Sequence, residues 1–237
     1  MIKAIFFDLD GTLLPLDEKE FTKIYFNLLK EKAKSLGYDE DKFIKCIIQT
    51  ISLMYSNDGK KTNEEVFWDH FLNTFGQDKI IDKLEFDNFY KNEFLKTKIC
   101  CKDNPLAKKI VTYCRKNFLY VVLSTNPIFP KIATETRMSF ISLKDKDFDL
   151  VTTYENSYFT KPNPNYFIEI LKRFKLNPDE VILFGNNELE DYECAKKCGI
   201  KTFLVGDYII KDDRVKESIP HYKLEEIIKI LESLKKE

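Results

Sequence analysis

One stretch decides the fold class of this sequence: Phe6-Phe7-Asp8-Leu9-Asp10-Gly11-Thr12-Leu13-Leu14. It ends an apolar run, Ile2 to Phe7, that is typical of a buried parallel strand closed by turn residues. Ligands of open α/β sheets bind beyond the carboxyl ends of such strands, where Asp8 and Asp10 are placed. Residues two apart share one face of a strand, so these carboxylates would repel each other unless a cation or a reaction partner used them. The stretch therefore predicts a divalent metal together with a nucleophile or an acid–base pair.

Composition and charge limit the class of protein. The 237 residues are 43% hydrophobic and 32% charged, which suits a soluble core with a smaller inserted module. A net charge of −1 gives no general argument for nucleic-acid or membrane binding. There is no apolar run of membrane-spanning length, and Met1 leads straight into the first strand without a signal-peptide pattern. We therefore expect a cytoplasmic protein, a monomer or weak homodimer, whose six cysteines are reduced.

The segment after the first strand changes character. Residues 16–98 contain no strand-like run and are dense in Phe, Tyr, Leu, Ile and Lys. Apolar residues there recur with a period of 3.6, which predicts an inserted helical bundle. Its helices are expected at Phe21–Lys32, Phe43–Met54, Asn63–Thr74 with Gly76 as the stop, and Phe86–Phe94.

From residue 99 strands and helices alternate again, which predicts a parallel sheet with right-handed crossovers. We predict an α/β protein with a Rossmann-like doubly wound core, residues 1–15 and 99–237, and an α-helical cap domain, residues 16–98. The further strands are expected at Tyr120–Leu123, Leu150–Thr152, Val181–Phe184 and Lys201–Val205. The further helices are expected at Pro105–Lys116, Phe129–Met138, Asn165–Phe174, Glu190–Cys198 and Leu224–Leu234.

Three more polar loops join the one that contains Asp8. Ser124-Thr125-Asn126 follows the second predicted strand, and Gly185–Asp191 follows Val181–Phe184. Lys161 lies in a loop of its own before the helix Asn165–Phe174. A parallel sheet places the carboxyl ends of its strands at one edge, so we expect these loops to converge.

The four loops, in this order and strand context, resemble those of the haloacid dehalogenase-like (HAD) superfamily hydrolases, most of which are phosphatases. The resemblance covers the whole chain in order, and the position of the helical insertion matches the helical C1-type cap of that family. It implies a phosphatase that depends on Mg²⁺ and hydrolyses a small phosphorylated metabolite through an aspartyl-phosphate intermediate.

The resemblance also implies roles for single residues. Asp8 would be the nucleophile, and Asp10 the acid for the leaving alcohol and then the base for water. Lys161 and Ser124 would stabilise the charge of the transferring phosphoryl group. Backbone and side-chain groups of the first two loops would bind phosphate or substrate: Leu9, Gly11, Thr12, Thr125 and Asn126. For Asn126 a role in the turn is an equal alternative.

The expected Mg²⁺ ligands are Asp8, Asp10 through its carbonyl, Asn186 and Asp191. The fourth loop departs from the family, because Asn186 and Asn187 stand where its first aspartate belongs. An amide oxygen binds Mg²⁺ but contributes no charge, so we expect weaker metal binding. Glu188 and Glu190 would either compensate or simply suit the positive end of a helix.

Two alternatives stay open. A dehalogenase of this family lacks an acid at the position of Asp10, because a halide leaves without a proton. Asp10 therefore favours phosphate-ester chemistry, which includes a sugar phosphomutase with the same site. The other alternative is a phosphate- or metabolite-binding protein with little turnover, and only Asn186 and Asn187 favour it.

Overall fold

A computed structural model describes residues 1–234 of the chain and contains a six-stranded parallel sheet in the order β3-β2-β1-β4-β5-β6. The central strand β1 aligns Phe7 with Leu123 of β2 and with Phe184 of β4. The residues that follow these three positions therefore leave the sheet at one edge. The strands are β1 Ala4–Phe7, β2 Tyr120–Leu123, β3 Leu150–Val151, β4 Val181–Gly185, β5 Lys201–Val205 and β6 His221–Tyr222.

Helices cover both faces of the sheet. Ile5 and Phe7 of β1 belong to one buried cluster with α5 and α9, whereas Ala4 and Phe6 belong to a second with α7 and α8. This confirms the predicted doubly wound core with an inserted helical cap. The helices of the core are α5 Pro105–Asn117, α6 Lys131–Ser139, α7 Asn165–Phe174, α8 Cys194–Lys197 and α9 Ile227–Leu234.

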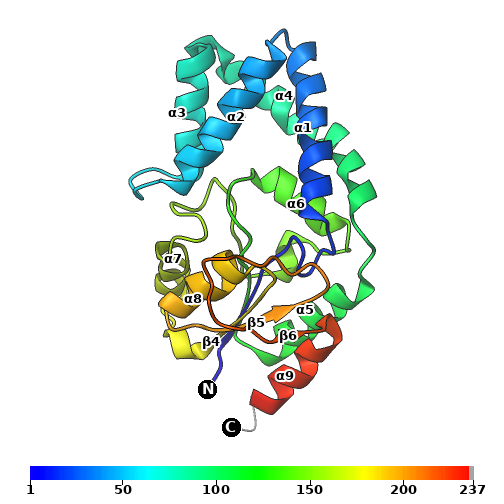
Figure 1. Cartoon of the computed structure of the whole chain (residues 1–237), viewed down its shortest axis with the longest axis vertical. Coiled ribbons are helices and arrows are strands. Elements are labelled where there is room, and N and C mark those ends of the chain that lie inside the picture. Colours follow the sequence, from blue (N-terminus) through cyan, green and yellow to red (C-terminus); the bar gives the residue numbers. More distant parts are fainter. Residues whose placement is uncertain (235–237) are drawn as a thin grey trace.

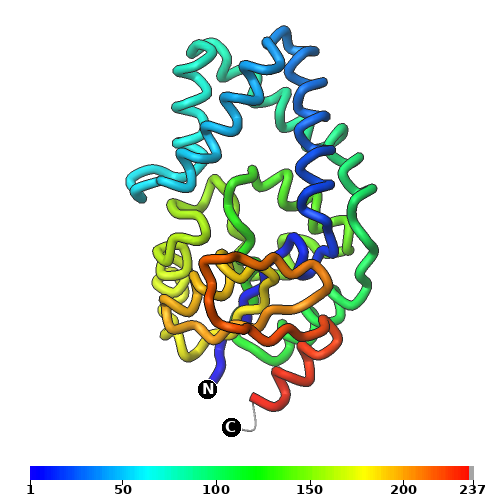
Figure 2. Tube along the Cα trace, in the orientation of Figure 1, coloured from blue at the N-terminus to red at the C-terminus, as the bar shows by residue number. Residues whose placement is uncertain are grey.

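The cap stands over the carboxyl edge of the sheet (Figure 1). Its rings pack in a triangle, in which Phe43, Phe71 and Phe86 have centroids 5.7–5.9 Å apart. The chain enters and leaves the cap side by side (Figure 2), because Leu16 and Cys101 form an antiparallel bridge. The division at residues 15/16 and 98/99 stays a prediction. The helices are α1 Glu18–Ser35, α2 Glu40–Tyr55, α3 Asn63–Phe75 and α4 Lys83–Lys91, followed by a 3₁₀ segment at Glu93–Cys100.

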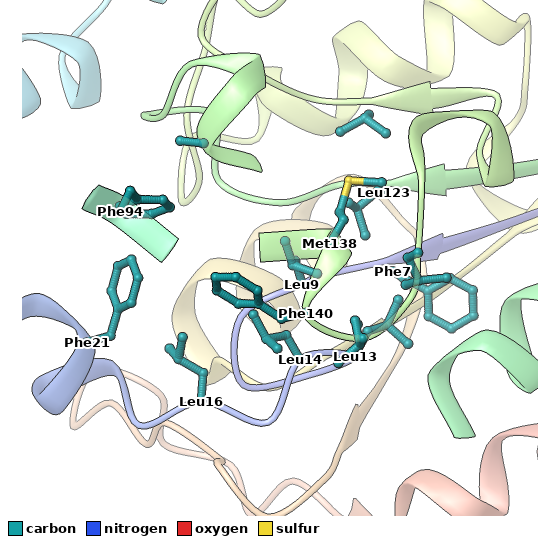
Figure 3. Close-up of a cluster of buried hydrophobic side chains, with 14 of the residues drawn as sticks. Phe7, Leu9, Leu13, Leu14, Leu16, Phe21, Phe94, Leu123, Met138 and Phe140 are labelled. Carbon is teal, nitrogen blue, oxygen red and sulfur yellow. The ribbon is translucent and has the colours of Figure 1, made fainter. Parts of the chain in front are cut away.

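Apolar residues anchor the turn that carries the two aspartates. Leu9, Leu13 and Leu14 are fully buried, and they lie near Met138 and Phe140 (Figure 3). These buried side chains anchor the backbone on either side of Asp10.

The structure corrects the predicted elements at several ends. The helix expected at Glu190–Cys198 is a π-helical turn, Glu188–Glu193, followed by α8, because the Asn187 side chain accepts the N–H groups of Leu189 and Glu190. Strand β6 was not predicted, since two residues carry no periodic signal. Among the described residues none of the six cysteines is in a disulfide, and there is no helix with the length and apolarity needed to cross a membrane.

Asn104 ties the turn that carries Asp8 and Asp10 to the core. Its side chain accepts from Ala107 N–H at the start of α5 and donates to the Leu13 carbonyl over 2.7 Å. Asn104→Ala removes a helix cap and leaves a buried carbonyl without a donor, so the free energy of unfolding should fall by about 1–3 kcal/mol. Urea denaturation measures this. Thr112→Ala, at an exposed position of α5, is the control, and equal effects of both variants would contradict the assignment.

Candidate active site

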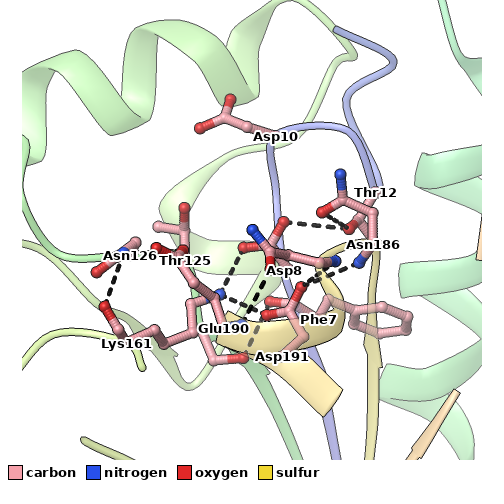
Figure 4. A network of polar contacts seen from close by, with 12 residues as sticks. Phe7, Asp8, Asp10, Thr12, Thr125, Asn126, Lys161, Asn186, Glu190 and Asp191 are labelled. Carbon is pink, nitrogen blue, oxygen red and sulfur yellow. Dashed lines mark hydrogen bonds and ion pairs between the residues drawn. The ribbon is translucent and has the colours of Figure 1, made fainter. Parts of the chain in front are cut away.

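The four loops meet around one buried ammonium group, as Figure 4 shows. Lys161 Nζ lies 2.8 Å from Asp8 Oδ1 and 2.6 Å from Asp191 Oδ1, and its side chain is 1% exposed. The second oxygen of Asp191 accepts the N–H groups of Asn186 and Asn187, each over 3.0 Å. Both carboxylate oxygens of Asp191 are therefore used within the protein, and its charge fixes Lys161 and the fourth loop in place.

Asp8 is the carboxylate at the floor of the site. Burial raises its pKa to about 7, with the charges of Asp191 and Asp10 adding to the rise and Lys161 opposing it. Its second oxygen, Oδ2, accepts from the Thr12 hydroxyl over 3.1 Å. A carboxylate poised in this way can act as a nucleophile once a phosphoryl group and its counter-charge are bound.

Asn186 fills the position where an aspartate was expected. Its Nδ2 donates to the Tyr208 carbonyl over 2.7 Å, so its Oδ1 faces Thr12 Oγ1 at 3.3 Å. Gly11 makes this approach possible, because its φ is +78° and a Cβ there would lie 2.1 Å from Asn186 Nδ2. Asn187 caps the π-helical turn instead, so Asn186 is the asparagine beside the turn that carries Asp8.

The donor atoms near Asp8 fit a hard cation. Asp8 Oδ2 and Asn186 Oδ1 converge on the same hydroxyl, and oxygens of this kind are the ligands that Mg²⁺ prefers. Asp191 offers no comparable free oxygen. Within residues 1–234 there is no cluster of three or more His, Cys, Asp or Glu side chains placed to hold a metal, so such a cation would keep several waters.

Asp10 points away from this network (Figure 4) and forms an ion pair that the sequence did not reveal. Arg137 Nη1 lies 2.6 Å from Asp10 Oδ2, and the arginine side chain is 1% exposed. The guanidinium carbon also lies 4.3 Å from the ring centroid of Phe129. Burial raises the pKa of Asp10 above its usual range, and Arg137 opposes that rise. The one available signal was that Arg137 lies four residues after the buried Ala133 on α6.

In the second loop, Ser124 and Thr125 form hydrogen bonds within the protein. Ser124 is fully buried, and its hydroxyl donates to the Phe7 carbonyl over 3.2 Å. The Thr125 carbonyl accepts from the Tyr166 hydroxyl, and Thr125 is one of the residues that line the cavity between the cap and the sheet. Figure 4 shows Thr125 beside Asp8 and Asn126. In the first loop, the Gly11 N–H donates to the Leu14 carbonyl, and the Leu9 carbonyl accepts from the Thr12 N–H. These backbone groups therefore form hydrogen bonds within the turn.

Asn126 joins the core to the cap. Its Nδ2 donates to the Tyr55 hydroxyl over 3.1 Å and to Glu190 Oε2 over 3.0 Å, and the Tyr55 hydroxyl donates to Glu190 Oε1 over 3.1 Å. Glu190 therefore faces the site, and burial raises its pKa to about 7. Glu188 turns away and accepts the N–H of Asp212.

A cavity of about 240 Å³ lies between the cap and the carboxyl edge of the sheet. The core contributes Asp8, Asp10 and Lys161, and the cap contributes Phe21, Tyr25 and Tyr55. This volume suits a small ligand rather than a large one.

Comparison with known proteins places the chain in a family. The model of the family described as haloacid dehalogenase-like hydrolase matches residues 5–205. The chain is 23% identical to "Pyrophosphatase PpaX" of Halalkalibacterium halodurans over 98% of this chain and 96% of that protein. It is also 23% identical to "Phosphorylated carbohydrates phosphatase" of Thermotoga maritima, over 98% of this chain and all of that protein.

Solved structures share the fold. A HAD phosphatase from Thermococcus onnurineus superposes with a TM-score of 0.61 at 21% identity, covering 97% of this chain and 98% of that one. A 2-haloacid dehalogenase from Pseudomonas syringae superposes with a TM-score of 0.64 at 18% identity, covering 99% of this chain and all of that one. Since the family model spans most of the sequence, the chain belongs to the haloacid dehalogenase-like hydrolases.

Proposed function

We propose that the chain is a Mg²⁺-dependent phosphatase that hydrolyses a small phosphorylated metabolite through an aspartyl-phosphate on Asp8. One observation carries the proposal: Asp8 lies beside the buried ammonium of Lys161 at the floor of a cavity that Asp10 also lines. The relatives named as phosphatases, including "Glyceraldehyde 3-phosphate phosphatase" of Pyrococcus furiosus, support a phosphate-ester substrate.

The proposed hydrolysis has two steps. In the first, the Asp8 carboxylate attacks phosphorus, the bond to the alcohol oxygen breaks, and Asp10 protonates that oxygen. In the second, Asp10 accepts a proton from the water that attacks the aspartyl-phosphate, and inorganic phosphate leaves. Lys161 offsets negative charge in both steps. A Mg²⁺ ion, held by Asp8, Asn186 and the carbonyl of Asp10, would supply further positive charge to the phosphoryl oxygens.

A binding protein with little turnover is a second candidate, which the amide at Asn186 favours because it lowers the charge available to a metal. The phosphomutase alternative gains no specific support from the geometry. The C1 type of the cap, the cytoplasmic location and the oligomeric state stay predictions.

Hydrolysis of p-nitrophenyl phosphate tests the central residue. We expect turnover by the native chain that needs millimolar Mg²⁺ and is abolished in Asp8→Asn, because the amide is not a nucleophile. Asp213→Asn, an exposed position outside the cavity, is the matched control and should keep the native rate. No turnover by the native chain over a broad panel of phosphorylated metabolites would favour the binding protein instead.

Replacement of Arg137 tests the ion pair with Asp10. Arg137→Met leaves the Asp10 carboxylate without its buried counter-charge, so we expect kcat to fall about tenfold or more, since general acid–base catalysis contributes about 10²–10⁴-fold. Arg137→Lys keeps a cation and should recover part of the rate. Thermal denaturation of both variants separates lost activity from lost stability. Native kcat in a folded Arg137→Met protein would rule out the role.

A further inference from the structure

The cavity beside Asp8 is rich in negative charge. The described residues that line it include two cations, Lys161 and Arg137. Lys161 is paired with Asp8 and Asp191, and Arg137 with Asp10. The same lining has five carboxylates: Asp8, Asp10, Glu18, Glu190 and Asp191. Each cation is thus already paired with a carboxylate, and neither is left for a second anionic group of a ligand.

Among the described residues, the two other carboxylates of the lining, Glu18 and Glu190, form no salt bridge with a cation. Glu18 is the first residue of α1 on the cap side, and it belongs to the lining of the cavity. Glu190 is held by the neutral donors Tyr55 and Asn126. A second anionic group on the ligand would lose hydration beside Glu18 and Glu190 and would gain no counter-ion. Its binding in the cavity would therefore be unfavourable.

Aromatic rings form the rest of the wall over the site. Tyr25 lies 5.3 Å from Phe129 and 5.9 Å from Phe21, measured between ring centroids. The Tyr25 hydroxyl is already hydrogen-bonded to the Tyr90 hydroxyl over 2.8 Å. This wall therefore offers apolar aromatic surface to the part of a ligand that lies beyond its phosphate.

We propose that the substrate is a phosphate monoester of an apolar or aromatic alcohol that carries no second anionic group. Pyrophosphate, bisphosphates and phosphorylated carboxylic acids are then excluded. The proposal rests on the phosphatase function proposed above and specifies its substrate class.

Three phosphate esters of primary alcohols test this substrate class, with the full-length chain and Mg²⁺. Their leaving groups are all primary alcohols, so the three esters have similar intrinsic reactivity. They are phenylpropyl phosphate, carboxypropyl phosphate and propanediol bisphosphate. We expect kcat/KM for phenylpropyl phosphate to exceed that of the other two by about tenfold or more, as pocket contacts of this size allow. An equal or higher kcat/KM for either ester with a second anion would overturn the proposal.

Replacement of Glu18 tests whether its negative charge causes the discrimination against a second anionic group. Glu18→Gln should raise kcat/KM for carboxypropyl phosphate relative to phenylpropyl phosphate by about threefold or more, because it removes one repelling charge. Glu20→Gln, in the same first turn but outside the cavity lining, is the control and should leave the ratio unchanged. An unchanged ratio in Glu18→Gln would overturn this cause of the rejection.

Binding separates this inference from the proposed function. If the native chain hydrolyses none of the three esters, the phosphatase proposal fails, but the cavity still makes a prediction. Calorimetry with phenylbutyl phosphonate and carboxybutyl phosphonate, each in the presence of Mg²⁺, should then show tighter binding of the phenyl compound. Equal or tighter binding of the carboxylate would contradict the substrate class.

Discussion

The buried ammonium of Lys161 is the group on which the site depends. Its two carboxylate partners come from separate segments, Asp8 from the end of β1 and Asp191 from the turn after β4. An unpaired charge at 1% exposure would cost several kcal/mol, so this pairing holds the three segments together. The second oxygen of Asp8 is not part of the ion pair and accepts from the Thr12 hydroxyl, near Asn186. The stability of the fold and the proposed catalysis would therefore depend on the same charges.

The cap contributes to the burial of the charges in the site. Burial raises the pKa of both Asp8 and Glu190 to about 7, and Tyr55 of the cap is hydrogen-bonded to Glu190. The contact of the cap with the core through Tyr55 and Asn126 is polar and confined to the rim of the cavity. The cap residues Phe21 and Tyr25 add aromatic side chains to the wall of the cavity. The cap would therefore select ligands mainly by disfavouring groups that do not suit this wall.

The sequence predicted most of the core and the residues around Lys161, because buried strands and their turn residues leave local signals. It failed where partners are distant. Arg137 and Asp10 lie 127 positions apart, and a single arginine on an amphipathic helix gives no sign of its partner. Tyr55 and Glu190 lie 135 positions apart, and their meeting depends on how the cap sits on the core. The π-helical turn differs from the predicted helix start because one side chain, Asn187, decides where the turn begins.

The most direct test of the account is to locate the covalent intermediate. The native chain would be mixed with Mg²⁺ and a phosphate ester that it hydrolyses, and the reaction would be quenched in acid within milliseconds. The protein would then be digested and its peptides examined by mass spectrometry. The account predicts a phosphoryl group on Asp8, in a peptide that Asp8→Asn protein yields only unmodified. A phosphoryl group on Asp10 or on any other residue, or turnover with no phosphorylated peptide, would contradict the assignment of Asp8 as nucleophile.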